Sequence, residues 1–131
     1  MSNDTMTIRE MCDTFQVTAR TLRFYEAKEL LAPIRVGQKR LFTKRDRARL
    51  KLIIRGKRYG FSLEEMRQIL DLYDSEGEPA QLKAAVKTGK IHLATMMDER
   101  DRLERNIKDL KEELNCAERE LAMSNPNPAH A

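Results

Sequence analysis

Apolar residues recur every three or four positions in two short stretches near the N-terminus, which is the spacing of one face of an α-helix. The first stretch begins with a capping box, with Thr7 at the N-cap and Glu10 three residues later. The second begins at Thr18, a residue type whose hydroxyl accepts from free backbone N–H groups. Residues 13–16 are expected to form the tight connection between them. Two short helices joined by a few residues predict a helix-turn-helix, although this connection contains no glycine.

The second of these helices carries arginines on one face. Arg20 and Arg23 lie three positions apart and therefore share that face. Thr21 and Phe24 lie beside them, whereas Leu22 faces the opposite way. Such a helix suits a DNA major groove, where arginine pairs with guanine through two hydrogen bonds. An ordinary amphipathic helix with a solvated basic face fits the same spacing equally well. The neighbouring stretches of the sequence distinguish this alternative from a DNA-binding helix.

A short β-hairpin is predicted after Pro33, which stops helical continuation. Its strands, residues 34–36 and 39–42, flank a Gly-Gln turn, and apolar side chains alternate with basic ones. We expect the apolar face to pack on the domain while Arg35 and Arg40 offer positive charge to a DNA backbone. The alternative is an ordinary solvated basic hairpin, since a phosphate contact needs little specific geometry.

Two further helices complete the predicted N-terminal domain. A capping box at Thr43 opens one that runs to about Tyr59, and Gly60 suits the left-handed position that ends it. Another capping box at Ser62 opens the second, which ends near residue 75. The side chains expected to face inward from the two helices are Leu50, Ile53, Ile54, Leu63, Met66, Ile69, Leu70 and Tyr73.

One long helix follows a connector at residues 76–90. Nine positions of residues 91–122 recur at alternating steps of three and four, which predicts a coiled-coil seam. These positions are Leu93, Met96, Arg100, Leu103, Ile107, Leu110, Leu114, Ala117 and Leu121. The last six are assigned to a homodimer interface, because a seam of roughly 45 Å at 1.5 Å per residue is too long to pack back on a small domain. Residues 123–131 are expected to be a disordered tail.

The charge balance of the 131-residue chain indicates which partner the N-terminal half meets. Residues 1–61 carry 15 Lys and Arg against 6 Asp and Glu, whereas residues 62–131 carry 10 against 15. This asymmetry favours an anionic polymer as partner of the N-terminal half. No segment has the pattern of an interfacial or membrane-spanning helix or of a signal peptide.

The remaining chemistry argues against an enzyme and against a metal or cofactor. There is no glycine-rich phosphate loop, and the two histidines, His92 and His130, have no recognisable catalytic companions. The two cysteines, Cys12 and Cys116, lie far apart without metal-like spacing, which fits a reducing cytoplasm. Cys12 is expected in the core. Cys116 is expected to be partly exposed and is a candidate redox-sensitive thiol. His92 is expected to lie in solvent.

Taken together, the motifs resemble a MerR-type transcriptional regulator. Residues 21–26 read TLRFYE, the hairpin ends in RLF at 40–42, and residues 59–66 read YGFSLEEM, followed by the terminal coil. The resemblance is close over residues 7–74. It implies a mainly α fold, with a winged helix-turn-helix domain over residues 1–75 and a dimer through an antiparallel coiled coil. It also implies binding of a promoter palindrome inside an overlong spacer, where distortion of the DNA brings both RNA polymerase elements into line.

The resemblance also assigns site residues. Arg20 and Arg23 would contact bases or phosphates from the major groove, and Tyr25 would contact a phosphate. Arg40 matches the basic residue of the second wing strand, whereas Lys39 stands where family members often have an aromatic residue. The DNA-contacting set is then Thr18, Arg20, Thr21, Arg23, Tyr25, Arg35, Lys39 and Arg40.

The sequence leaves open both the regulated pathway with its effector and one rival class of protein. Residues 38–43 and 46–53 resemble most the LiuR-like branch, which controls branched-chain or short-chain acyl-CoA catabolism, but no effector is indicated. A small-molecule site would have to lie between residues 78–92, the coil and the winged domain. The rival interpretation is a coiled-coil interaction protein whose basic domain binds RNA or a protein. Only seven aromatic residues are available for the base stacking that RNA readers use.

Overall fold

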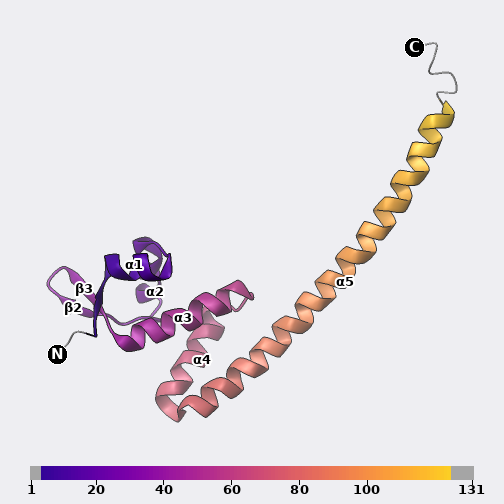
Figure 1. The fold of residues 1–131 in the computed structure, drawn as a ribbon. Coiled ribbons are helices and arrows are strands. Elements are labelled where there is room, and N and C mark those ends of the chain that lie inside the picture. Colours follow the sequence, from indigo (N-terminus) through magenta and orange to yellow (C-terminus); the bar gives the residue numbers. More distant parts are fainter. Residues whose placement is uncertain (1–3, 125–131) are drawn as a thin grey trace. The chain divides into compact units, whose positions relative to one another are not determined.

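The computed structural model describes residues 4–124, and the chain divides after His92 into two units. The first unit holds four helices, a small sheet and the beginning of a fifth helix, α5 (Figure 1). The second unit holds the rest of α5. Residues 125–131 of the predicted tail lie outside the described residues, and Met123 and Ser124 are helical.

The helix-turn-helix consists of α1, Ile8–Phe15, and α2, Ala19–Ala27. Both predicted N-caps are confirmed, and α1 has the complete capping box. The connection is shorter than expected, because residues 13–15 still belong to α1. Gln16 makes the turn in the left-handed conformation, at φ 56° and ψ 47°, and so takes the place of a glycine.

A three-stranded antiparallel sheet adjoins these helices. The predicted hairpin is confirmed as β2, Ile34–Val36, and β3, Lys39–Phe42, and Figure 1 shows it beside the N-terminal end of α3. A two-residue strand that the sequence did not indicate, β1 at Met6–Thr7, pairs with the other side of β3. The wing, defined as β2 and β3, is therefore fastened along one edge to the start of the chain.

The next two helices have the predicted capping boxes and form the other side of the core. They are α3, Lys44–Arg58, and α4, Leu63–Glu76, and Gly60 between them has the predicted positive φ, 89°. Two of the inward positions were wrong: Ile54 is 38% exposed and Tyr73 is 53% exposed. The core cluster consists of Met11, Leu22, Leu30, Leu31, Phe42, Leu50, Ile53, Met66 and Leu70, with Cys12 packed against it.

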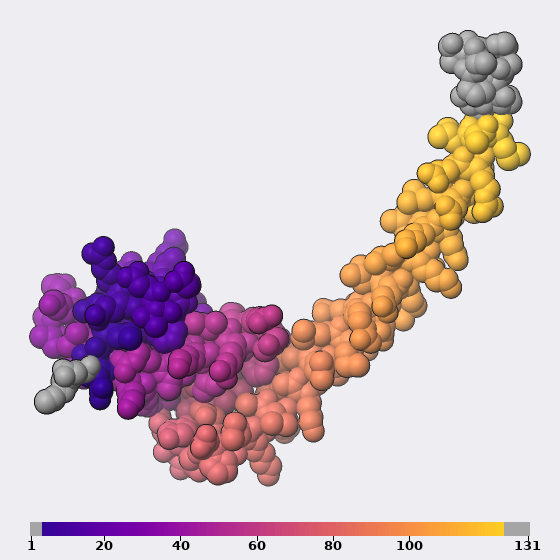
Figure 2. Space-filling model, in the orientation of Figure 1, coloured from indigo at the N-terminus to yellow at the C-terminus, as the bar shows by residue number. Residues whose placement is uncertain are grey.

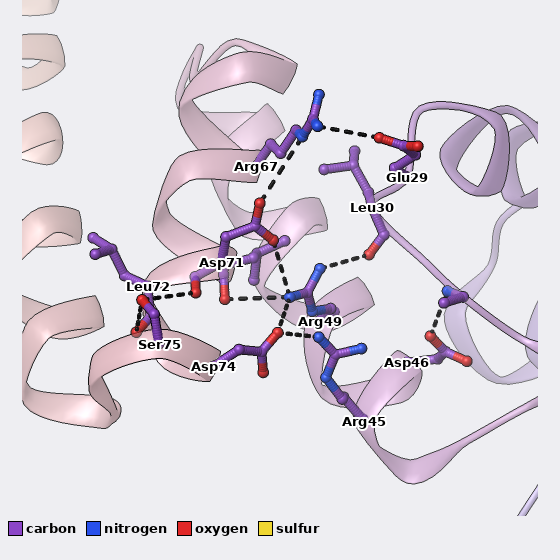
Figure 3. A network of polar contacts seen from close by, with 12 residues as sticks. Glu29, Leu30, Arg45, Asp46, Arg49, Arg67, Asp71, Leu72, Asp74 and Ser75 are labelled. Carbon is purple, nitrogen blue, oxygen red and sulfur yellow. Dashed lines mark hydrogen bonds and ion pairs between the residues drawn. The ribbon is translucent and has the colours of Figure 1, made fainter.

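Two buried charged side chains of α3 connect these elements (Figure 3). Asp46 closes its own capping box and also accepts a hydrogen bond from the backbone N–H of Ala32, at 2.9 Å. Arg49 donates to the backbone carbonyls of Leu30 and Leu70, at 3.2 and 3.3 Å. Arg49 also pairs with Asp71 and Asp74 of α4. The segment between α2 and the wing is thereby joined to both later helices.

A single helix, α5 at Glu78–Ser124, follows Gly77, whose positive φ of 91° ends α4. The residues predicted as a connector are thus mostly the first turns of α5. From Leu93 onward this helix has no buried residue, and Figure 2 shows its orange-to-yellow part as a narrow column of atoms. Within residues 4–124, no helix is long and apolar enough to cross a membrane.

We predict that Gly56→Ala destabilises the domain by about 1–2 kcal/mol, although alanine favours helices. A Cβ at Gly56 would lie 2.2 Å from Sδ of Met66, and that side chain is only 3% exposed and cannot swing into solvent. Gly89→Ala is the matched control in α5, where the nearest atom is an ordinary 3.8 Å away. The control should gain roughly 0.5–1 kcal/mol. Denaturant unfolding measures both, and a stabilising Gly56→Ala would show that α3 and α4 are not packed as described.

Candidate nucleic-acid interface

The N-terminus of α2 is held in place by its own threonines and by one apolar side chain. The Thr18 hydroxyl accepts from the backbone N–H of Thr21 at 3.1 Å, and the two hydroxyls lie 2.9 Å apart. Leu22, on the opposite side of the helix, is completely buried. As predicted, α2 therefore has an anchored inner side and a separate outer side.

The outer side of α2 carries charge that the domain does not neutralise. Arg20 and Arg23 are both exposed, and neither forms an ion pair within residues 4–124. Phe24 beside them is 45% exposed, and the ammonium of Lys28 lies 5.6 Å from the centre of its ring. Burial raises the pKa of Tyr25 above 10.0, so its hydroxyl remains a hydrogen-bond donor at neutral pH.

A hollow of about 270 Å³ joins this side of α2 to the end of α3. It is lined by Arg20, Thr21, Phe24, Tyr25, Lys57 and Leu63. Lys57 was absent from the set predicted from the sequence. The sequence shows three basic residues, Arg55, Lys57 and Arg58, near the end of α3, but only the fold places Lys57 beside α2.

The wing has the opposite orientation to the one predicted. Ile34 and Val36, expected to pack on the domain, are 50% and 55% exposed. Arg35 and Arg40, which pair across the two strands, turn toward α2 instead. The reason is Phe42, which lies on the same side of β3 as Arg40 and is completely buried. Lys39 is exposed at the hairpin turn.

Both wing arginines meet one carboxylate of α2. Oε1 of Glu26 lies 2.5 Å from Nε of Arg40, and Oε2 lies 3.1 Å from Nη1 of Arg35. Burial alone would raise the pKa of Glu26, but the hydrogen bonds and charges of the two arginines outweigh it and hold the pKa below 4.5. Glu26 is therefore ionised at neutral pH and neutralises part of the wing charge.

The remaining candidate groups are His92, Cys116 and any set of metal-ligating side chains. His92 was expected in solvent, but its ring stacks on Phe61 at 4.9 Å between centroids, and Nε2 lies 2.9 Å from Oε1 of Glu65. It therefore holds the end of the first unit against the N-terminus of α4. Cys116 is exposed. Within residues 4–124, no cluster of three or more His, Cys, Asp or Glu could hold a metal ion.

A helix-turn-helix with a hairpin wing and an unneutralised basic outer side defines a winged helix-turn-helix DNA-binding domain. Residues 6–73 match the MerR HTH family regulatory protein model, and residues 47–113 match the MerR, DNA binding model. The chain belongs to the MerR family of DNA-binding transcriptional regulators.

Named relatives agree with this assignment. HmrR, an HTH-type transcriptional regulator of Rhizobium leguminosarum bv. viciae, is 30% identical over 107 residues, which cover 80% of this chain and 83% of HmrR. ZntR, an HTH-type transcriptional regulator of Escherichia coli K12, is 37% identical over 67 residues, which are 50% of this chain and 48% of ZntR. The matched part therefore spans about half the length of ZntR.

A solved structure shares the fold. The N-terminal part of MtaN, the Bacillus subtilis multidrug transporter activator, superposes with a TM-score of 0.65 at 26% sequence identity. The superposition covers 83% of this chain and 97% of the MtaN chain.

We predict that Glu26→Gln lowers stability at neutral pH and that this difference disappears in acid. Because the pKa of Glu26 is lowered in the folded state, its ionisation stabilises the fold above about pH 4.5. The contribution is lost as the pH falls through the folded-state pKa. Denaturant unfolding of both proteins between pH 3 and pH 7 measures the difference. A deficit that is constant over this range would mean that the charge of Glu26 does not stabilise the fold.

Proposed function

We propose that the chain acts as a homodimer that binds a promoter palindrome and activates or represses transcription by distorting the spacer between two RNA polymerase elements. The observation that carries this proposal is the outer side of α2, where two exposed arginines have no ion-pair partner within the described residues. Exposed charges on a solvated surface are common, but here Arg20 also lines a hollow together with Thr21, Phe24, Tyr25 and Lys57.

The base-reading residues proposed for α2 are Arg20 and Arg23, which can each form two hydrogen bonds with guanine. Thr18 and Thr21 lie at the helix N-terminus, where phosphate is favoured by free N–H groups and the helix dipole. Tyr25 and Lys57 line the hollow beside α2, and their hydroxyl and ammonium are the proposed phosphate contacts there. Arg35, Lys39 and Arg40 of the wing are the proposed contacts to the neighbouring backbone.

The proposed dimer interface lies on the nine-position seam from Leu93 to Leu121, and its assigned contacts are the last six positions, from Leu103 onward. The leucine, isoleucine and methionine side chains of the seam are exposed in the single chain, from 43% at Met96 to 70% at Leu121. A stripe of this length on one helix needs an apolar partner surface, and a second copy of the same helix supplies the matching a and d positions. Arg100, the one charged position, pairs with the adjacent Asp101 of its own helix.

Dimerisation would place two copies of α2 on one duplex. Two reading helices bind half-sites one or more helical turns apart, which explains a palindromic target. Bending or untwisting the DNA between them depends on its deformability and can realign promoter elements. Activation as one mode of action is supported by the similarity to MtaN, which is described as an activator.

The regulated genes are proposed from the LiuR-like resemblance of residues 38–43 and 46–53, which points to acyl-CoA or branched-chain catabolism. An effector site has a candidate place within the first unit. Clefts of about 470 and 160 Å³ between α3, α4 and the start of α5 share two lining residues, Leu52 and Gln81. Their combined size is within the range of small-molecule sites.

The experiment that tests DNA reading compares Arg23→Ala with Arg119→Ala, an equal loss of charge on the exposed part of α5. Binding is measured on the DNA upstream of the chain's own gene, after footprinting has located the protected site. Arg23→Ala should weaken specific binding by about 1–3 kcal/mol and relax the base preference at one position. The assignment of α2 fails if Arg23→Ala retains the affinity and base preference of the Arg119→Ala control.

We further predict that Ile107→Asp combined with Leu110→Asp gives monomers at micromolar concentration. Burying each apolar side chain contributes about 1.5–3 kcal/mol, and the dimer loses each contact twice. The two aspartates would also place charges in a dry seam. The monomer should lose most palindrome binding, because two half-sites cooperate only when the reading helices are linked.

Lys108→Asp combined with Asn115→Asp is the control, since both positions lie outside the seam. Sedimentation measures the mass of each variant against the 15.3 kDa of one chain. A dimer of the Ile107, Leu110 variant would place the interface elsewhere and contradict the proposed seam.

A further inference from the structure

The wing holds two like charges directly opposite each other. Arg35 of β2 and Arg40 of β3 are cross-strand partners, and like charges at such positions destabilise a hairpin. Glu26 of α2 lies against both, with one carboxylate oxygen for each guanidinium. The hairpin therefore depends on a counter-ion that comes from the DNA-reading helix.

We propose that Glu26 is a positioning and specificity-determining residue for DNA binding. In this proposal Glu26 holds Arg35 and Arg40 side by side as a preformed phosphate clamp, and its negative charge restrains the wing from binding unrelated duplexes. The inference rests on the proposed function, in which the wing contacts the DNA backbone.

The hydrogen-bond donors support a clamp. A guanidinium has five N–H donors, and Glu26 engages Nε of Arg40 and Nη1 of Arg35. The other donors of each arginine remain for a phosphate. Arg35 is half exposed and Arg40 is 23% exposed, so a phosphate can approach from the side of Arg35. Two arginines already fixed by a carboxylate lose less side-chain freedom when a phosphate binds.

The charge of Glu26 supports the second part of the proposal. Binding to unrelated duplexes is almost entirely electrostatic, and its salt dependence follows the number of phosphates neutralised. Within the wing contact, Glu26 offsets one of two positive charges. Specific binding also depends on the correct placement of the clamp. The offset of one charge therefore lowers the affinity for the specific site less than the affinity for unrelated duplexes. A carboxylate here therefore raises the ratio of specific to non-specific affinity, the quantity on which site selection depends.

The test uses the full chain, the footprinted duplex and a scrambled duplex of equal length, with binding measured over a range of salt concentrations. Glu26→Gln should steepen the logarithmic salt dependence on the scrambled duplex by about one unit. Its specificity ratio should fall roughly tenfold, because the clamp also loses its fixed geometry. Glu26→Asp keeps the charge but is too short to bridge both arginines. It should retain the wild-type salt dependence and still lose part of the specificity ratio.

Glu112→Gln is the control for net charge, since it removes one exposed carboxylate from α5 outside the proposed seam. Equal changes in Glu26→Gln and Glu112→Gln would overturn the proposal, as would wild-type salt dependence and specificity in Glu26→Gln. Hydrogen exchange at Nε of Arg40, measured without DNA, should be slow in the wild type and fast in Glu26→Gln. Fast exchange in the wild type also overturns the clamp.

Different outcomes contradict the proposed function and the clamp. If the wild-type chain binds both duplexes equally, sequence-specific DNA binding is absent and the proposed function falls, together with the clamp that rests on it. If the wild type discriminates between the duplexes and Glu26→Gln discriminates equally well, only the clamp falls.

Discussion

The burial of Leu22 on the inner side of α2 orients this helix, and the exposed charges of the first unit follow from that orientation. Leu22 is buried in the core, and the Thr18 cap fixes the first turn of the helix. Because the inner side is held in this way, Arg20 and Arg23 are left on the outer side with no acid within the described residues to neutralise them. A helix that could roll about its axis would lose both the packing and the presentation of charge.

The buried polar groups extend this constraint to the neighbouring elements. Asp46 and Arg49 fasten the segment after α2 to α3 and α4, and Glu26 fastens the wing to α2 itself. These are charges that the fold removes wholly or partly from water, so each requires a partner of fixed geometry. The result is that α2 and the wing, which are separate in the sequence, are held together at one surface.

Much of this fold was predictable from the sequence where short-range chemistry decides it. Caps depend on residues three positions apart, so the starts of all four helices of the winged domain were located correctly. The face of the wing was predicted wrongly, because alternation defines two faces without saying which one is inside. Phe42, on the same side of β3 as Arg40, was the overlooked signal. The contact with Glu26 and the position of Lys57 beside α2 depend on tertiary packing, for which no local pattern exists.

The central claim is that this chain reads duplex DNA with two linked copies of α2. The most direct measurement is selection of bound sequences from a pool of random duplexes by the wild-type protein. Two linked copies of α2 should enrich a palindrome whose half-sites lie a whole number of helical turns apart. Enrichment of a single unrepeated half-site, or of no sequence at all, would contradict it.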